Sequence, residues 1–122
     1  MEHDINYPPL TGNDMRVLTV LLENGVCNLS GLKEAIGNPS TRKSTILRLK
    51  DLGLVDYELD NSTHLSYRVS LTSLGMQTAV IMALGKECME GTLDLERDSL
   101  DEKVTDMLAV AKSKISKSRE GA

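Results

Sequence analysis

The sequence predicts an α+β domain that is mostly α-helical, and three observations lead to this fold class. Apolar residues recur at helical spacing in three segments of the first half of the chain, and each segment follows a capping residue. After Gly53 the apolar period changes to two over a pair of short runs, which predicts a two-stranded β-hairpin. Two further helical segments begin near Thr72 and Ser99. We therefore expect three helices, a hairpin, a fourth helix and an additional C-terminal helix.

The composition fits one globular domain with a modest core. The chain has 122 residues, of which 40% are hydrophobic and 26% charged. It has no long apolar run and begins with an acidic segment, so we expect no membrane segment, no signal peptide and a cytoplasmic location. The few cysteines and histidines lack metal-binding spacing, so no metal, cofactor or disulfide is expected. Cys27 is interpreted as a packed core side chain, with a thiol redox sensor as the alternative.

Two short helices are expected before the central segment. Thr11 and Asp14 have the spacing of a capping pair, and the helix that they open would end at Asn24-Gly25. Asn28 would cap a second, short amphipathic helix that Gly37 closes. The next helix would follow almost directly, and two helices joined by so tight a turn have helix-turn-helix geometry.

The segment from Asn38 to Val55 organises the rest of the chain. Asn38 is a favourable N-cap, Pro39 suits the first helical position, and Gly53 can end the helix. One stripe of this helix is apolar, with Ile46, Leu49 and Leu52, whereas its other faces carry hydroxyl groups and cations. Such a helix fits the major groove of DNA, and the alternative is an ordinary solvated surface helix.

Charge is segregated along the chain, although the net charge is −4 and the sequence pI is about 5.1. Residues 42–50 carry four cations and no acid, whereas residues 87–106 carry eight acids against two cations. The negative total argues against a nonspecific nucleic-acid binder, but binding depends on the local field. The candidate recognition helix, residues 39–52, is therefore locally basic.

The second half of the chain combines the hairpin with two helices. Turn-forming residues 60–64 separate the two alternating runs, and Thr72 caps the helix that follows. Ile81 and Met82 widen the apolar arc of that helix, which indicates a second buried surface. After a break at Gly91-Thr92, the last helix has a single apolar stripe formed by Leu100, Val104, Met107, Leu108, Ala111 and Ile115.

Three local patterns resemble those of winged helix-turn-helix transcriptional regulators of the MarR and ArsR type. The segment Ser40 to Val55 is similar to the recognition helix of these regulators, running into Gly-Leu-Val. The hairpin follows directly, and the wing closes with a run similar to their Leu-Thr-x-x-Gly, namely Ser70-Leu71-Thr72-Ser73-Leu74-Gly75. The resemblance covers about residues 10–90 and implies a winged helix-turn-helix domain there, with residues 92–118 as a C-terminal dimerisation helix.

The resemblance implies a homodimeric, sequence-specific regulator of transcription that places residues 39–52 in the major groove of double-stranded DNA. Contacts from the helix would come from Ser40, Thr41, Arg42, Lys43, Ser44 and Arg48, with Arg48 paired to guanine. Contacts from the wing would come from Asn61, Ser62, Thr63, His64 and Arg68. The six stripe residues of the last helix would form the dimer interface. Some relatives bind a small effector, so an unidentified effector is a further expected partner.

Two features depart from the family pattern. The expected wing tip carries no Arg or Lys, and the outward strand positions Asp56, Glu58 and Asp60 would repel phosphates if they faced DNA. Arg42 occupies a position where the pattern usually has a buried aliphatic residue. Either the helix begins later than expected, or the Arg42 side chain reaches out to a phosphate.

Other functions remain open at this point. The acidic strand and the net charge would also suit a winged-helix protein-interaction module that binds no DNA. An enzyme is not expected, because no nucleophile arrangement, phosphate-binding glycine loop or carboxylate pair is recognisable, and no catalytic residue is assigned. The last helix could also fold back on its own domain instead of pairing with a second copy.

Overall fold

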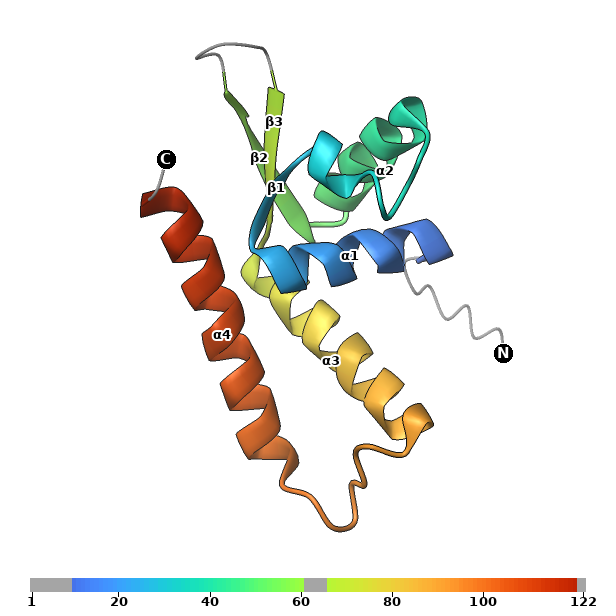
Figure 1. Cartoon of the computed structure of the whole chain (residues 1–122), viewed down its shortest axis with the longest axis vertical. Helices are drawn as coiled ribbons and strands as arrows, with labels where there is room; N and C mark the ends of the chain where they lie inside the picture. Colours follow the sequence, from blue (N-terminus) through green and yellow to red (C-terminus); the bar gives the residue numbers. More distant parts are fainter. Residues whose placement is uncertain (1–9, 61–65, 121–122) are drawn as a thin grey trace, which may run out of the picture.

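The computed structural model describes residues 10–60 and 66–120. Its elements are α1 (Gly12–Asn24), β1 (Val26–Asn28), the 3-10 helix η1 (Ser30–Leu32), α2 (Pro39–Asp51), β2 (Val55–Asp60), β3 (Ser66–Leu71), α3 (Ser73–Glu90) and α4 (Leu100–Glu120). The predicted mostly helical α+β class is confirmed. Figure 1 shows the sheet between α2 on one side and α4 on the other, with α1 and α3 towards the bottom of the view.

The helix starts follow the capping signals in the sequence. In α1 the Thr11 side chain accepts a hydrogen bond from the Asp14 backbone N–H (3.2 Å), and the Asp14 carboxylate accepts one from the Thr11 N–H (2.8 Å). In α2 the Asn38 side chain accepts from the Thr41 N–H (3.1 Å), and Pro39 occupies the first position. These bonds satisfy N–H groups that have no partner inside a helix, so both starts are fixed locally.

The expected second helix is much shorter than predicted, and a strand precedes it. The Asn28 side chain accepts a hydrogen bond from the Gly31 N–H (2.7 Å), but only the three residues of η1 adopt a regular 3-10 conformation before the chain continues as turns. Gly31 has a low helix propensity, which favours this short form. Leu32 and Ile36 are nevertheless buried, so the segment supports α2 as expected of the first half of a helix-turn-helix.

The wing is part of a three-stranded antiparallel sheet with the order β1-β3-β2. The hairpin of β2 and β3 was expected, whereas β1 is an addition that pairs Cys27 with Val69. Because successive strand residues point to opposite faces, the sheet has two chemically different sides. One side faces α2 and carries the buried Val55 and Val69, and the other carries Asp56 and Glu58.

The chain turns from the hairpin into α3 through a tight junction. Thr72 caps α3 by accepting from the Gly75 N–H (3.0 Å), and its hydroxyl donates to the Gly53 carbonyl (2.6 Å). A Cβ atom on Gly75 would lie 1.8 Å from the Leu54 carbonyl oxygen, so no larger residue fits there without movement of the backbone. The Leu-Thr-x-x-Gly run therefore locks the end of the wing onto the turn after α2.

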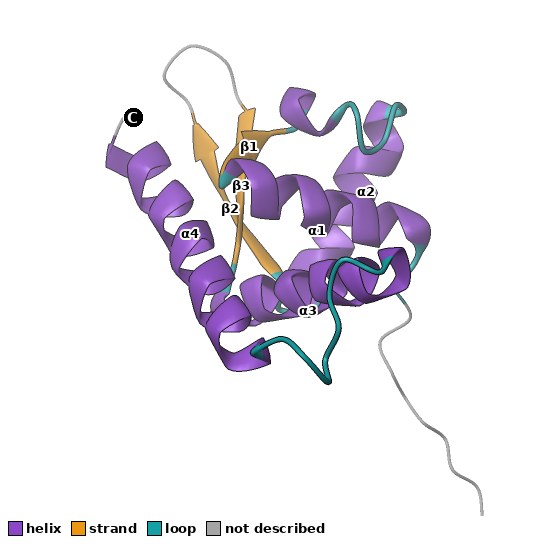
Figure 2. Ribbon diagram, turned by 60° about the horizontal axis from the view of Figure 1, so that its bottom comes forward, coloured by secondary structure: helices purple, strands orange, loops and turns teal. Residues whose placement is uncertain are grey.

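The stripe of α4 packs on its own domain, which is the alternative to the expected intersubunit seam. Ala111 is buried in the main core, and Leu108 and Ile115 pack against it, while Val104 and Met107 pack against Val80, Leu84 and Leu93. Leu100 remains 39% exposed. Figure 2 shows α4 running beside the sheet and meeting the end of α3. In this chain residues 92–118 thus share the core of residues 10–90, because a stripe this apolar finds cover at α1, α3 and β1.

Two absences hold for the described parts of the chain. None of the described helices combines the length and the apolar character that crossing a membrane requires. Among residues 10–60 and 66–120, no three metal-binding side chains come together.

Candidate nucleic-acid interface

The α2 helix is anchored on one side and open on the other. Ile46 and Leu49 are buried in the main core, which fixes the helix against α1 and the sheet. Ser40, Lys43, Ser44 and Leu47 are exposed on the opposite faces. Figures 1 and 2 both show α2 at the edge of the molecule, on the side of the sheet away from α4. A helix held in this way can enter a groove without rearranging the core.

Arg42 lies inside the molecule, and the expected reach to a phosphate is corrected accordingly. Its residue is only 8% exposed, and its Nη1 donates to the Leu29 carbonyl (2.8 Å) in the turn before η1. The first turn of α2 therefore faces η1, and the position that family members fill with an aliphatic residue is filled here by a long side chain directed inwards. Arg42 joins the two helical parts of the helix-turn-helix and is withdrawn from the DNA surface.

Arg48 is tied to α1. Its Nη1 contacts Oδ2 of Asp14, the same oxygen that caps α1 through the Thr11 N–H. The Asp14 residue is 1% exposed and the Arg48 side chain 36%. The sequence marked Asp14 as a capping residue only, and no local signal indicated that it would also hold the recognition helix.

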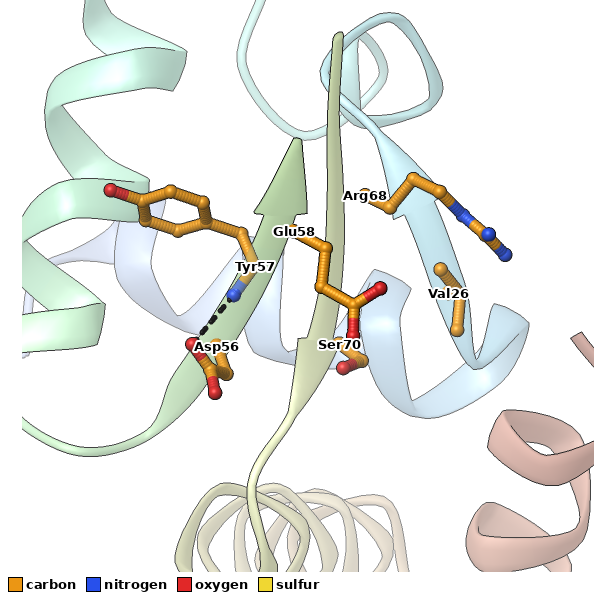
Figure 3. Close-up of a pocket in the computed structure, with 6 residues that line it drawn as sticks. All are labelled: Val26, Asp56, Tyr57, Glu58, Arg68 and Ser70. Atoms are coloured by element: carbon orange, nitrogen blue, oxygen red, sulfur yellow. Dashed lines mark hydrogen bonds between the residues drawn. The ribbon is translucent and has the colours of Figure 1, made fainter. Parts of the chain in front are cut away.

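The wing residues divide between the two sides of the sheet. The expected contacts Asn61, Ser62, Thr63 and His64 lie outside the described residues. Arg68, Glu58 and Asp56 share the side away from α2, where with Val26 and Ser70 they line a shallow pocket of about 40 Å³. Figure 3 shows the Tyr57 ring directed away from Glu58 and Arg68. The acidic strand positions therefore do not share a surface with the exposed face of α2, which removes the repulsion that the sequence suggested.

Two tyrosines on the α2 side of the sheet contact lysines of the helix. The rings of Tyr57 and Tyr67 pack edge to face with their centroids 4.8 Å apart. Lys43 Nζ lies 5.8 Å from the centroid of Tyr67, and Lys50 Nζ lies 5.3 Å from that of Tyr57. Lys50 also donates to Asp56 (2.9 Å), whose carboxylate raises the pKa of Lys50. Sequence reasoning placed these rings only on the apolar face of the hairpin and did not link them to the candidate site.

A second concave surface lies between α1, α3 and α4. It is a groove of about 360 Å³ lined by Thr19, Leu22, Glu23, Ala83, Asp106, Met107, Val110, Ala111 and Lys114. Apolar side chains form its floor, and charged groups stand among the lining residues, which is the usual make-up of a small-molecule site.

Comparison with solved structures gives the same fold. A transcriptional regulator homologue from Pyrococcus horikoshii matches with a TM-score of 0.55 and 21% identity, covering 64% of this chain and 80% of its own. Bordetella bronchiseptica BpsR, whose DNA binding is regulated by 6-hydroxynicotinic acid, matches with a TM-score of 0.59 and 24% identity over 85% of this chain and 79% of its own. Lactococcus lactis ZitR, in an apo form, matches with a TM-score of 0.60 and 16% identity over 85% and 82%.

At these identities the likeness concerns the fold, and it confirms the winged helix-turn-helix architecture that the sequence predicts. A search with the sequence found no matching family model and no matching curated protein.

Proposed function

We propose that this protein is a sequence-specific DNA-binding regulator of transcription that places α2 in the major groove of double-stranded DNA and acts as a homodimer. The main support is the exposed face of α2, where Ser40, Lys43, Ser44 and Leu47 stand on a helix anchored by Ile46 and Leu49. The fold shared with a transcriptional regulator homologue and with DNA-binding BpsR supports the same function.

Base contacts are assigned to the outermost ridge of the helix. Ser40 and Ser44 offer hydroxyl groups that can meet base edges or phosphates, and the exposed Leu47 suits an apolar contact with a thymine methyl group. Thr41, which is half-buried, stands beside them. The two arginines of α2 are not part of this set, because both side chains are engaged within the domain.

Selection from a random DNA pool followed by gel retardation tests the proposal. We expect an enriched sequence motif and an affinity that falls with salt, with a slope near −0.9 for each phosphate contacted. Lys43→Ala should reduce the slope by about one, whereas Lys86→Ala, which removes an exposed lysine from α3, should leave it unchanged. Absence of retardation at about 50 mM salt would instead favour a protein-interaction module, because electrostatic binding is strongest there.

The homodimer is proposed to use surfaces that the monomer leaves open. On α3 the apolar residues Leu74, Ile81 and Met89 are 53%, 60% and 84% exposed, and Val110 of α4 is 53% exposed. A two-fold pair would place two recognition helices one turn of DNA apart, roughly 34 Å. Ile81→Glu should lower the mass measured by light scattering without lowering the melting temperature. Leu108→Glu should destabilise the fold, because Leu108 packs within its own domain.

The groove between α1, α3 and α4 is the proposed effector site. Its volume of about 360 Å³ suits a small, mainly apolar molecule, and Lys114 could pair with an acidic group. BpsR responds to 6-hydroxynicotinic acid, so aromatic carboxylic acids are the first compounds to test here. Binding should raise the melting temperature of the wild type and not that of Ala83→Trp, in which the indole would fill the groove.

A further inference from the structure

We infer that Lys43 and Tyr67 together form a phosphate-binding site at the junction of α2 and the wing, with Tyr57 holding the Tyr67 ring in place. This site rests on the proposed DNA-binding function and adds two tyrosines to the expected contacts. It would take over the backbone contact that regulators of this fold commonly make with basic residues at the tip of the wing.

The position of Lys43 is the first support. Lys43 and Lys50 are seven residues apart in α2 and so lie on the same side of the helix, which faces the wing. The Lys43 residue is exposed, and its ammonium lies over the Tyr67 ring at 5.8 Å from the centroid. An ammonium group has three donors, and a single ring face occupies one side of it, so donors remain for a phosphate.

The aromatic pair is the second support. Tyr67 and Tyr57 are half-buried, and their edge-to-face contact at 4.8 Å restricts the rotation of both rings. Tyr67 can therefore present its hydroxyl from a fixed position beside the Lys43 ammonium. A neutral donor next to a cation is a common way of binding a DNA phosphate, since side-chain hydroxyls contribute many backbone contacts.

The distribution of acids is the third support. Asp56 and Glu58 lie on the far side of the sheet from the Tyr67 ring, so they do not line the junction of α2 and the wing. Asp56 does bind Lys50, which partly neutralises that lysine and makes it the weaker phosphate ligand of the two. The site is for this reason centred on Lys43 and Tyr67, whereas Lys50 over Tyr57 closes its lower end.

Four variants test the site with the selected DNA duplex as the probe. Lys43→Ala should weaken binding roughly eightfold at 0.1 M salt, as expected for one lost phosphate contact. Tyr67→Phe keeps the ring under Lys43 but removes the hydroxyl, and it should weaken binding less than Tyr67→Leu, which removes both. Arg68→Ala is the matched control, because it removes a cation from the neighbouring residue on the opposite side of the sheet. It should leave both the affinity and the salt slope unchanged.

The outcomes separate this inference from the proposed function. If the wild type retards no DNA at about 50 mM salt, the proposed function and this site fail together. If the wild type binds and Tyr67→Leu binds equally well, only this site is refuted and Lys43 acts without the ring. Circular-dichroism melts of all variants show whether a loss of affinity reflects unfolding, and Tyr67→Phe provides the answer if Tyr67→Leu melts early.

Discussion

Replacing Arg48 by alanine distinguishes a base-reading arginine from one that positions the recognition helix. The contact of Arg48 with the buried Asp14 ties α2 to the first turn of α1. A guanine contact would require Arg48 to leave a carboxylate that is almost completely buried. We therefore expect Arg48→Ala to weaken binding to all DNA sequences alike by changing the angle of α2, without relaxing the preference at any one base pair.

The size of the effect follows from the burial of Asp14. Without Arg48 the carboxylate, which is 1% exposed, keeps the Thr11 N–H as a donor and loses its counter-charge. Removing one partner of a buried polar contact costs about 1–3 kcal/mol, and the 36% exposure of the Arg48 side chain lets water reduce this to about 2 kcal/mol. For a domain of this size such a loss lowers the melting temperature by roughly 8 °C.

Thermal melts combined with a double-mutant cycle measure this coupling. Asp14→Asn should resemble Arg48→Ala in both stability and DNA affinity, and the double variant should be hardly worse than either, because both remove the same contact. Lys50→Ala is the matched control on the same helix, since its ion pair with Asp56 is exposed and contributes little. Loss of selectivity at a single base pair, with an unchanged melting temperature, would show that Arg48 reads that base and that this reasoning is wrong.

Three further predictions concern particular residues. Gly75→Ala should destabilise by several kcal/mol because its Cβ would meet the Leu54 carbonyl, whereas Gly85→Ala in the same helix, with open space around it, should stabilise by up to about 1 kcal/mol in denaturant titrations. Alkylation followed by mass spectrometry should label the exposed Cys88 quickly and Cys27 slowly, because burial raises the pKa of the Cys27 thiol; equal rates would revive the redox-sensor interpretation. The Asp94 N–H donates to the Asp98 carboxylate and lowers its pKa, so this contact stabilises the fold above the ordinary pKa of Asp and is lost as the pH falls through the lower one; Asp98→Asn should flatten the acid limb of a plot of stability against pH.

The parts of the fold that could be predicted are those that local chemistry determines. Thr11, Asn38 and Thr72 each cap a helix through a backbone N–H three residues ahead, and a contact of such short range is visible in the sequence. The strand β1 could not be predicted in this way. Its three residues are too few to show a period, and it exists because β3, about forty residues later, offers an edge to pair with.

The candidate site was predicted at the level of the helix and missed at the level of its cations. From the sequence, every charged residue of α2 outside the apolar stripe was taken to point to solvent. In the structure the arginines turn inwards to a carbonyl and a carboxylate, and the lysines remain outside over tyrosine rings. The difference follows from the side chains themselves. A guanidinium is weakly hydrated and has several donors in one plane, so it tolerates partial burial against fixed acceptors, whereas a strongly hydrated ammonium stays at the surface. On a helix that carries both residue types, the lysines are thus the better first candidates for contact with phosphates, and the arginines need a search for an acceptor within the domain before a base is assigned to them.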